Sequence, residues 1–169
     1  IVLAEWKAPV YQNAITLITS SIRRNGPANI DSKIHHNNLI NNILAKIEAN
    51  NAGADDALML DNNGFVAETN ACNIFMIKNG MLFTPNADAC LPGITRKTVI
   101  TLCQQNNIPI HLKNISLTEM YNADQVFTTG TMGELTAVKM IDGRAIINRS
   151  GTDLLQHIND LFRNLTLAL

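Results

Sequence analysis

The amino-acid sequence predicts an α+β fold in which short strands outnumber helices. Apolar residues recur in short runs with the alternation of half-buried strands, and glycine-containing turns separate several of these runs. Longer stretches in which apolar residues have helical spacing lie between the clusters of strands and at the end of the chain. Because the strands cluster instead of alternating regularly with helices, an α+β fold fits better than a βαβ repeat.

We expect four of the strands to form two hairpins within residues 57–84. The runs 57–61 and 65–68 flank Asn62-Asn63-Gly64, and the runs 72–77 and 81–84 flank Lys78-Asn79-Gly80. Asparagine and glycine supply the positive φ angles that tight turns require. The four strands together predict a meander. Further strands are expected within 13–23, 108–112, 125–129, 135–141 and 144–147, the last two joined by a turn at Asp142-Gly143.

Four helical segments are expected. The first spans 37–52, and its apolar stripe predicts a buried face, so that Lys46 points outward; the stripe comprises Leu39, Ile40, Ile43, Leu44 and Ile47. The second runs from Pro92-Gly93 to about residue 106. Ser116 and Glu119 have the spacing of a capping box for a short third helix. An amphipathic helix ends the chain, with apolar residues from Leu154 to Leu165.

The composition predicts one globular domain and argues against several classes of partner. The 169 residues are 46% hydrophobic and 16% charged, with a net charge of −1. No predicted helix carries a basic stripe for nucleic acid, and no run approaches the ~20 apolar residues of a membrane span. Three cysteines without metal-ligand spacing indicate reduced thiols in a cytoplasmic protein. The first residue is Ile, and 1–4 reads as a buried strand, so we expect a chain cut from something longer.

Two segments have the chemistry of an anion site. In the segment 91–96 (LPGITR), a glycine followed by Ile94 and Thr95 at a helix start presents free N–H groups, and the helix dipole favours phosphate there. Read alone, this segment is more often an ordinary helix start, with proline in the first turn and Thr95 as the cap. In the segment 128–134 (TTGTMGE), two glycines around Thr131 follow an apolar strand, so the loop amides could hold an oxyanion. The alternative is a simple turn.

Two charged residues are candidates for chemistry, although each is more often a solvated charge when considered alone. Glu68 ends a strand, and its carboxylate could face a protonated ring nitrogen. Lys33 precedes the first helix, where a lysine of lowered pKa could bond covalently to an aldehyde. The neighbouring pair His35-His36 has no Cys or carboxylate ligand at metal spacing, so no metal site is expected.

The order and spacing of these segments resemble the class IV, or fold-type IV, aminotransferases. The resemblance covers about residues 15–165 and is most specific over 53–96 and 123–138. It implies the strand-rich pseudo-barrel of that family's large domain, flanked by helices and spanning 1–169, with the smaller N-terminal domain absent from this chain. It also implies pyridoxal 5′-phosphate as cofactor and a homodimer or larger assembly.

The resemblance further implies a role for each candidate residue. Glu68 matches the glutamate that pairs with the pyridine nitrogen, and Leu91 a residue that packs on the ring. Ile94, Thr95 and Thr131 match phosphate-binding positions, and Thr131 and Met132 lie where backbone groups bind the substrate carboxylate. Lys33 matches the catalytic lysine if the loop holds one or two extra residues; counted back from the helix, the lysine position falls at Ile34 or His35. Asn38 stands where many relatives have a tyrosine that bonds the cofactor's phenolic oxygen.

The implied reaction is transfer of an amino group between a branched-chain or D-amino acid and a 2-oxo acid, in an isolated chain that is incomplete as an enzyme. Two alternatives stay open. An aminodeoxychorismate lyase shares the cofactor and the fold, and a non-catalytic relative would keep the fold without turnover. Which residue faces the cofactor, Lys33 or His35, discriminates these possibilities.

Overall fold

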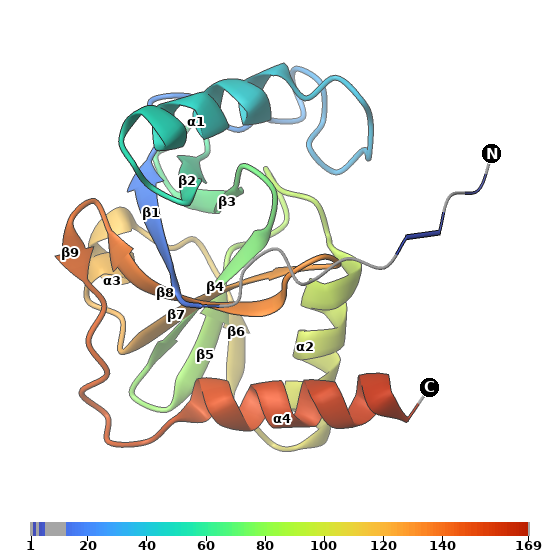
Figure 1. Cartoon of the computed structure of the whole chain (residues 1–169), viewed down its shortest axis with the longest axis vertical. Coiled ribbons are helices and arrows are strands. Elements are labelled where there is room, and N and C mark those ends of the chain that lie inside the picture. The colour runs from blue at the N-terminus through green and yellow to red at the C-terminus, as the bar shows by residue number, and fades with distance from the viewer. Residues whose placement is uncertain (1, 3, 6–12, 169) are drawn as a thin grey trace.

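The computed structural model describes residues 2, 4, 5 and 13–168, and within them nine strands form one mixed sheet. The strand order is β3-β2-β1-β8-β7-β4-β5-β6, with β9 paired to β8. The sheet curls into a half-barrel with helices around it, which confirms the predicted α+β class (Figure 1). The strands are β1 (Ile15–Thr19), β2 (Asp56–Leu60), β3 (Val66–Thr69), β4 (Asn73–Lys78), β5 (Met81–Thr84), β6 (Ile110–Leu112), β7 (Gln125–Gly130), β8 (Glu134–Ile141) and β9 (Arg144–Ala145).

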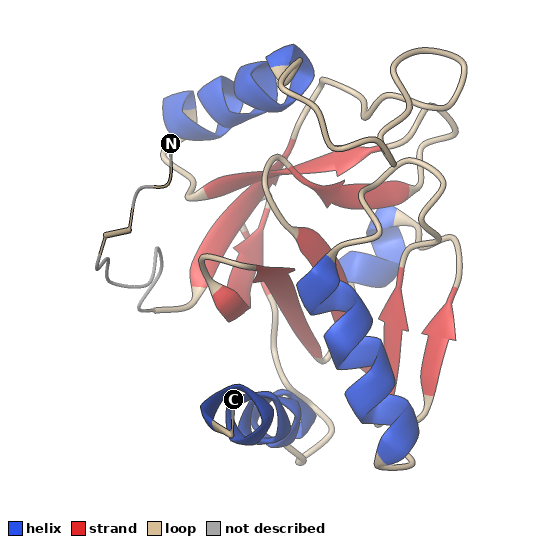
Figure 2. Cartoon of the chain, turned by 90° about the vertical axis from the view of Figure 1, so that its right-hand side faces the viewer, coloured by secondary structure: helices blue, strands red, loops and turns tan. Residues whose placement is uncertain are grey.

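Four helices are described: α1 (Ile40–Asn51), α2 (Ile94–Gln105), α3 (Leu117–Tyr121) and α4 (Leu154–Leu167). Helix α1 covers one end of the sheet, whereas α2 and α4 lie together at the other (Figures 1 and 2). The capping box of α3 is confirmed: the Ser116 hydroxyl accepts from the Glu119 N–H at 3.2 Å, and the Glu119 carboxylate accepts from the Ser116 N–H at 2.8 Å. None of the described helices has the length and hydropathy of a membrane span.

Both predicted hairpins are present, but the predicted meander is wrong. Strands β2 and β3 pair antiparallel, as do β4 and β5. However, β3 lies at one edge of the sheet, and β4 pairs with β7 instead of β3. The inner strand of each hairpin takes its second partner from a distant part of the chain, because β2 runs parallel to β1 and β4 antiparallel to β7. The two hairpins therefore belong to separate stretches of one curled sheet.

The central strands are buried on both faces, which explains their almost continuous apolar sequence. Along β4, Ile74 and Met76 pack into a cluster with α3, whereas Phe75 and Ile77 pack into a second cluster with α2 and α4. The Phe75 ring stacks on Phe127 of β7, with centroids 5.0 Å apart.

Helix α1 packs on the sheet through the face opposite to the predicted one. Ala45 and Ala49 are fully buried against β2, whereas the predicted inner residues Ile43 and Ile47 are 53% and 46% exposed. The small alanine side chains let the helix approach the sheet closely, and this packing overrides the periodicity of the larger residues. The prediction that Lys46 points outward is also wrong, because it lies on the sheet-facing side. Of the strand expected over 1–4, Ile1 and Leu3 lie outside the described residues, and Val2 is 97% exposed.

The orientation of α1 gives a stability test. Ala45→Leu should lower the free energy of unfolding by about 1–3 kcal/mol, because added methylenes have no room against β2. Ile43→Ala, on the exposed face of the same helix, should change it by no more than about 0.5 kcal/mol. Urea unfolding monitored by circular dichroism measures both. The reverse ranking would mean that α1 packs through its isoleucine face.

Candidate cofactor-binding site

Three adjoining cavities lie where the loop before α1, the end of β3, the start of α2 and the β7–β8 loop meet, and His35 and Ala71 line all three. The central cavity has a volume of about 400 Å³. The loop cavity, about 490 Å³, extends under the β7–β8 loop, and the arginine cavity, about 270 Å³, leads to Arg24. The central cavity is lined by His35, Glu68, Ala71, Asn73, Leu91, Gly93, Ile94, Thr95, Thr129, Gly130 and Thr131.

Glu68 is a buried carboxylate in the wall of the central cavity, with only 4% of its surface exposed. Strand β3 positions it opposite Met59 of β2. One carboxylate oxygen, Oε1, lies 2.5 Å from Nη2 of the buried Arg24, and Oε2 accepts a hydrogen bond of 3.1 Å from the Asn73 amide. Burial raises the pKa of Glu68 to about 7, although the Arg24 guanidinium favours the ionised form.

The start of α2 lines the same cavity, and Gly93 is the residue that makes its geometry possible. Gly93 has a φ of 62°, and a Cβ at this position would lie 1.9 Å from Oδ1 of Asn73. The Asn73 amide also donates to the Leu91 carbonyl at 2.8 Å, so one side chain ties Glu68 to the segment that leads into the helix. Ile94 and Thr95 then present the free amides of the first helical turn to the central cavity.

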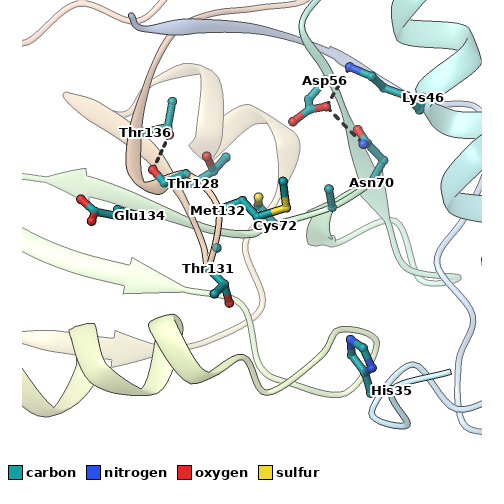
Figure 3. Close-up of a pocket in the computed structure, with 13 residues that line it drawn as sticks. His35, Lys46, Asp56, Asn70, Cys72, Thr128, Thr131, Met132, Glu134 and Thr136 are labelled. Atoms are coloured by element: carbon teal, nitrogen blue, oxygen red, sulfur yellow. Dashed lines mark hydrogen bonds and ion pairs between the residues drawn. The ribbon is translucent and has the colours of Figure 1, made fainter. Parts of the chain in front are cut away.

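The β7–β8 loop lines the same cavity as this helix start. Thr131 lines both the central and the loop cavity, whereas Met132 lines the loop cavity (Figure 3). Thr129, 2% exposed at the end of β7, also lines the central cavity. Its hydroxyl is one of two buried side-chain polar atoms in the described part of the chain that have no hydrogen-bond partner. Such an atom is costly to leave unpaired and therefore indicates a place for a ligand or water.

The structure brings Glu68, Leu91, Ile94, Thr95 and Thr131 to one cavity, as their sequence segments led us to expect. It does not bring Lys33 or Asn38 there: neither lines any of the three cavities. The Lys33 side chain is 40% exposed, and its ammonium lies 3.2 Å from Asp31. The covalent role of Lys33 and the hydrogen-bonding role of Asn38 therefore stay predictions that would require this loop to rearrange.

Sequence reasoning missed three residues of the site, namely Arg24, Asn73 and Thr129. Arg24 follows another arginine in the segment after β1, where two adjacent charges and Gly26-Pro27 indicate only a break in regular structure. Its pairing with Glu68 spans 44 residues of sequence and leaves no local pattern. Asn73 begins β4 and Thr129 stands near the end of β7, and the two residues are directly paired. A polar residue at the end of a strand whose middle is apolar was the signal that could have identified each of them.

The loop cavity holds a separate polar network (Figure 3). The Lys46 ammonium donates to the Asp56 carboxylate at 3.1 Å and to the Asp55 carbonyl, and the Asn70 amide donates to Asp56 at 3.1 Å. Cys72 lines this cavity as well, but burial raises the pKa of its thiol to about 11. A thiol of this kind is protonated at neutral pH, so Cys72 is a poor nucleophile.

Comparison with known proteins agrees with this geometry. Residues 1–141 match the family model described as amino-transferase class IV. A curated relative, branched-chain-amino-acid aminotransferase-like protein 2 of Arabidopsis thaliana, is 56% identical over 98% of this chain and 30% of its own length. The crystal structure of the branched-chain aminotransferase from Thermoproteus uzoniensis with norvaline matches with a TM-score of 0.87 at 34% identity, over 92% of this chain and 52% of that one.

A second solved structure, the branched-chain amino acid aminotransferase from Thermobaculum terrenum in its PLP-bound holo-form, has a TM-score of 0.85 at 30% identity, over 90% of this chain and 50% of that one. The chain thus spans under a third of that curated relative and about half of each solved structure. The family match covers most of the sequence, and the fold agrees with it. The chain belongs to the class IV aminotransferases.

Proposed function

We propose that this chain binds pyridoxal 5′-phosphate in the central cavity and takes part in transferring an amino group between an amino acid and a 2-oxo acid. The observation that carries the proposal is that a buried carboxylate and an anion-binding helix start line the same cavity. These two groups suit the two ends of the cofactor, its ring nitrogen and its phosphate. The cavity volume of about 400 Å³ is in the usual range for a small-molecule site.

The phosphate end fits three features of the cavity. The first amides of α2 are free to donate, and the helix dipole attracts an anion. A phosphate oxygen would give the Thr129 hydroxyl the partner that the protein itself does not supply. Thr131, in the β7–β8 loop, lines the same cavity, so a phosphate between Thr95 and Thr131 would receive donors from both segments.

The ring end fits Glu68. A carboxylate can accept a hydrogen bond from a protonated ring nitrogen, and Asn73 holds the Glu68 side chain in place while donating to it. Leu91 also lines the cavity and offers an apolar surface to the ring. When bound, the protonated ring supplies an electron sink for the substrate's α-carbon. Backbone groups of Thr131 and Met132 are proposed to bind the substrate carboxylate.

The names of the relatives favour a branched-chain amino acid as substrate over the lyase alternative. The Arabidopsis relative carries branched-chain aminotransferase in its name, and the Thermoproteus structure was solved with norvaline. We further infer a cytoplasmic protein that assembles as a homodimer or larger. The exposed apolar face of α1, with Ile40, Ile43 and Ile47, supports such an assembly.

The pKa of Glu68 predicts how cofactor binding depends on pH. Below about pH 7, Glu68 is protonated before binding, so a cationic ring displaces that proton when it binds. The affinity for pyridoxal phosphate should therefore rise by up to about tenfold per pH unit as the pH increases to about 7, and then level off. Glu68→Gln should remove this rise but keep the cofactor bound through its phosphate. Spectrophotometric titration measures both.

Turnover gives a second readout of the same variant. Glu68→Gln should lower it about 100-fold or more with a branched-chain amino acid, because a neutral amide does not hold the ring proton. Glu119→Gln, whose carboxylate belongs to the capping box of α3, is the matched control and should leave turnover unchanged. A Glu68→Gln protein with near-normal turnover, or with the same pH dependence as wild type, would show that Glu68 does not contact the ring.

The buried Arg24–Glu68 pair predicts a large effect on stability. Arg24→Met leaves the Glu68 carboxyl buried without its cation, so its pKa should rise above about 7 and the free energy of unfolding should fall by about 3–5 kcal/mol. A carboxyl whose pKa is raised by folding lowers the stability of the folded protein as the pH rises. The stability lost in Arg24→Met should therefore be smaller in mild acid. Adding Glu68→Gln to Arg24→Met should restore part of the stability. A loss under about 1 kcal/mol by chemical denaturation would contradict the pairing.

A further inference from the structure

His35 is the titratable residue that all three cavities share. It lines the central cavity together with Glu68 and Thr95, the loop cavity together with Lys46, and the arginine cavity together with Arg24. Lys33 stands only two residues earlier in the same loop but lines none of the three. The loop therefore presents an imidazole, and no ammonium, to the central cavity.

The loop is held in this arrangement on both sides of His35. Before it, the backbone N–H groups of Lys33 and Ile34 donate to the Asp31 side chain and carbonyl, at 3.0 and 2.9 Å. The hydroxyl of the buried Ser32 donates to the Asn25 carbonyl at 2.6 Å. After it, Nδ1 of His36 accepts from the Asn38 N–H at 3.1 Å. Bringing Lys33 into the cavity would require breaking the Asp31 turn and its ion pair, whereas His35 already faces it.

Lys46 does not supply an amine to the central cavity either. Among the lysines that the structure describes, it is the one that lines any of these three cavities, and that is the loop cavity. Its ammonium is engaged by the Asp56 carboxylate (Figure 3) and by the Asp55 carbonyl. These contacts hold the Lys46 ammonium in the loop cavity, and Lys46 does not line the central cavity.

We propose that His35, and no lysine, faces the reactive end of the cofactor in the central cavity, so that the cofactor is bound without a covalent link to the protein. This inference rests on the proposed function. Imidazole forms no stable imine with an aldehyde, but it is the side chain most often used for proton transfer. With the cofactor bound, the ring would supply the electron sink, and His35 would be the side chain placed to accept and return a proton in the central cavity.

Borohydride trapping tests the inference with a readout that is independent of turnover. The protein is saturated with pyridoxal phosphate, reduced with sodium borohydride and mapped by mass spectrometry of its peptides. Wild type should carry no pyridoxyl group on Lys33 or Lys46 above the level found when inorganic phosphate competes, and dialysis should remove the cofactor. His35→Lys should gain a near-stoichiometric pyridoxyl group at position 35 and the visible absorption of a protein Schiff base. His35 is exposed, so this substitution should not disturb folding.

His36→Lys is the matched control, because His36 lines the arginine cavity but not the central one, and should gain no such group. Stoichiometric labelling of Lys33 or Lys46 in wild type would overturn the inference and leave the proposed function standing. A His35→Lys protein that binds the cofactor without labelling at position 35 would overturn it as well. Failure of wild type and both variants to bind pyridoxal phosphate would instead overturn the proposed function, and the inference with it.

Discussion

The arrangement of the site depends on the burial of one charge. Glu68 is almost removed from water, and an isolated carboxylate in such a place would be strongly destabilising. Arg24 balances the charge of Glu68. The Asn73 amide donates a hydrogen bond to the second Glu68 oxygen and another to the Leu91 carbonyl. The ion pair therefore joins the segment after β1 to β3, and Asn73 joins β3 to the start of α2. The residues proposed to bind the ring and the phosphate are fixed relative to one another by this one set of contacts.

Features that follow from local sequence were predictable. The turns at Lys78-Asn79-Gly80 and Asp142-Gly143 have the positive φ angles that their sequences require, and each joins the expected pair of strands. The capping box at Ser116 and the helix start at Gly93 are also local, because the residues involved are neighbours in the chain. Candidate phosphate-binding segments are recognisable for the same reason. Their glycines and free backbone amides lie within a few consecutive residues of the sequence.

Features that depend on distant partners were not predictable. The periodicity of α1 predicts an isoleucine face against the sheet, but Ala45 and Ala49 fit closer to β2 and decide the orientation. The meander failed because β4 finds its neighbour in β7, about 50 residues away. The Arg24–Glu68 pair is equally non-local. From the sequence, the position of the family's catalytic lysine matched either Lys33 or the Ile34–His35 positions, depending on the length of the loop before α1. In the structure, this loop turns His35 toward the central cavity.

We propose that the helix start at Gly93 and the β7–β8 loop bind one phosphate while Glu68 binds the ring attached to it. A crystal structure of the protein soaked in pyridoxal phosphate is the decisive measurement. We expect the phosphate between the amides of Ile94 and Thr95 and the loop at Thr131, with the Thr129 hydroxyl donating to it and the ring nitrogen within hydrogen-bond distance of Glu68. A cofactor bound outside the central cavity, or one whose ring nitrogen faces away from Glu68, would contradict it.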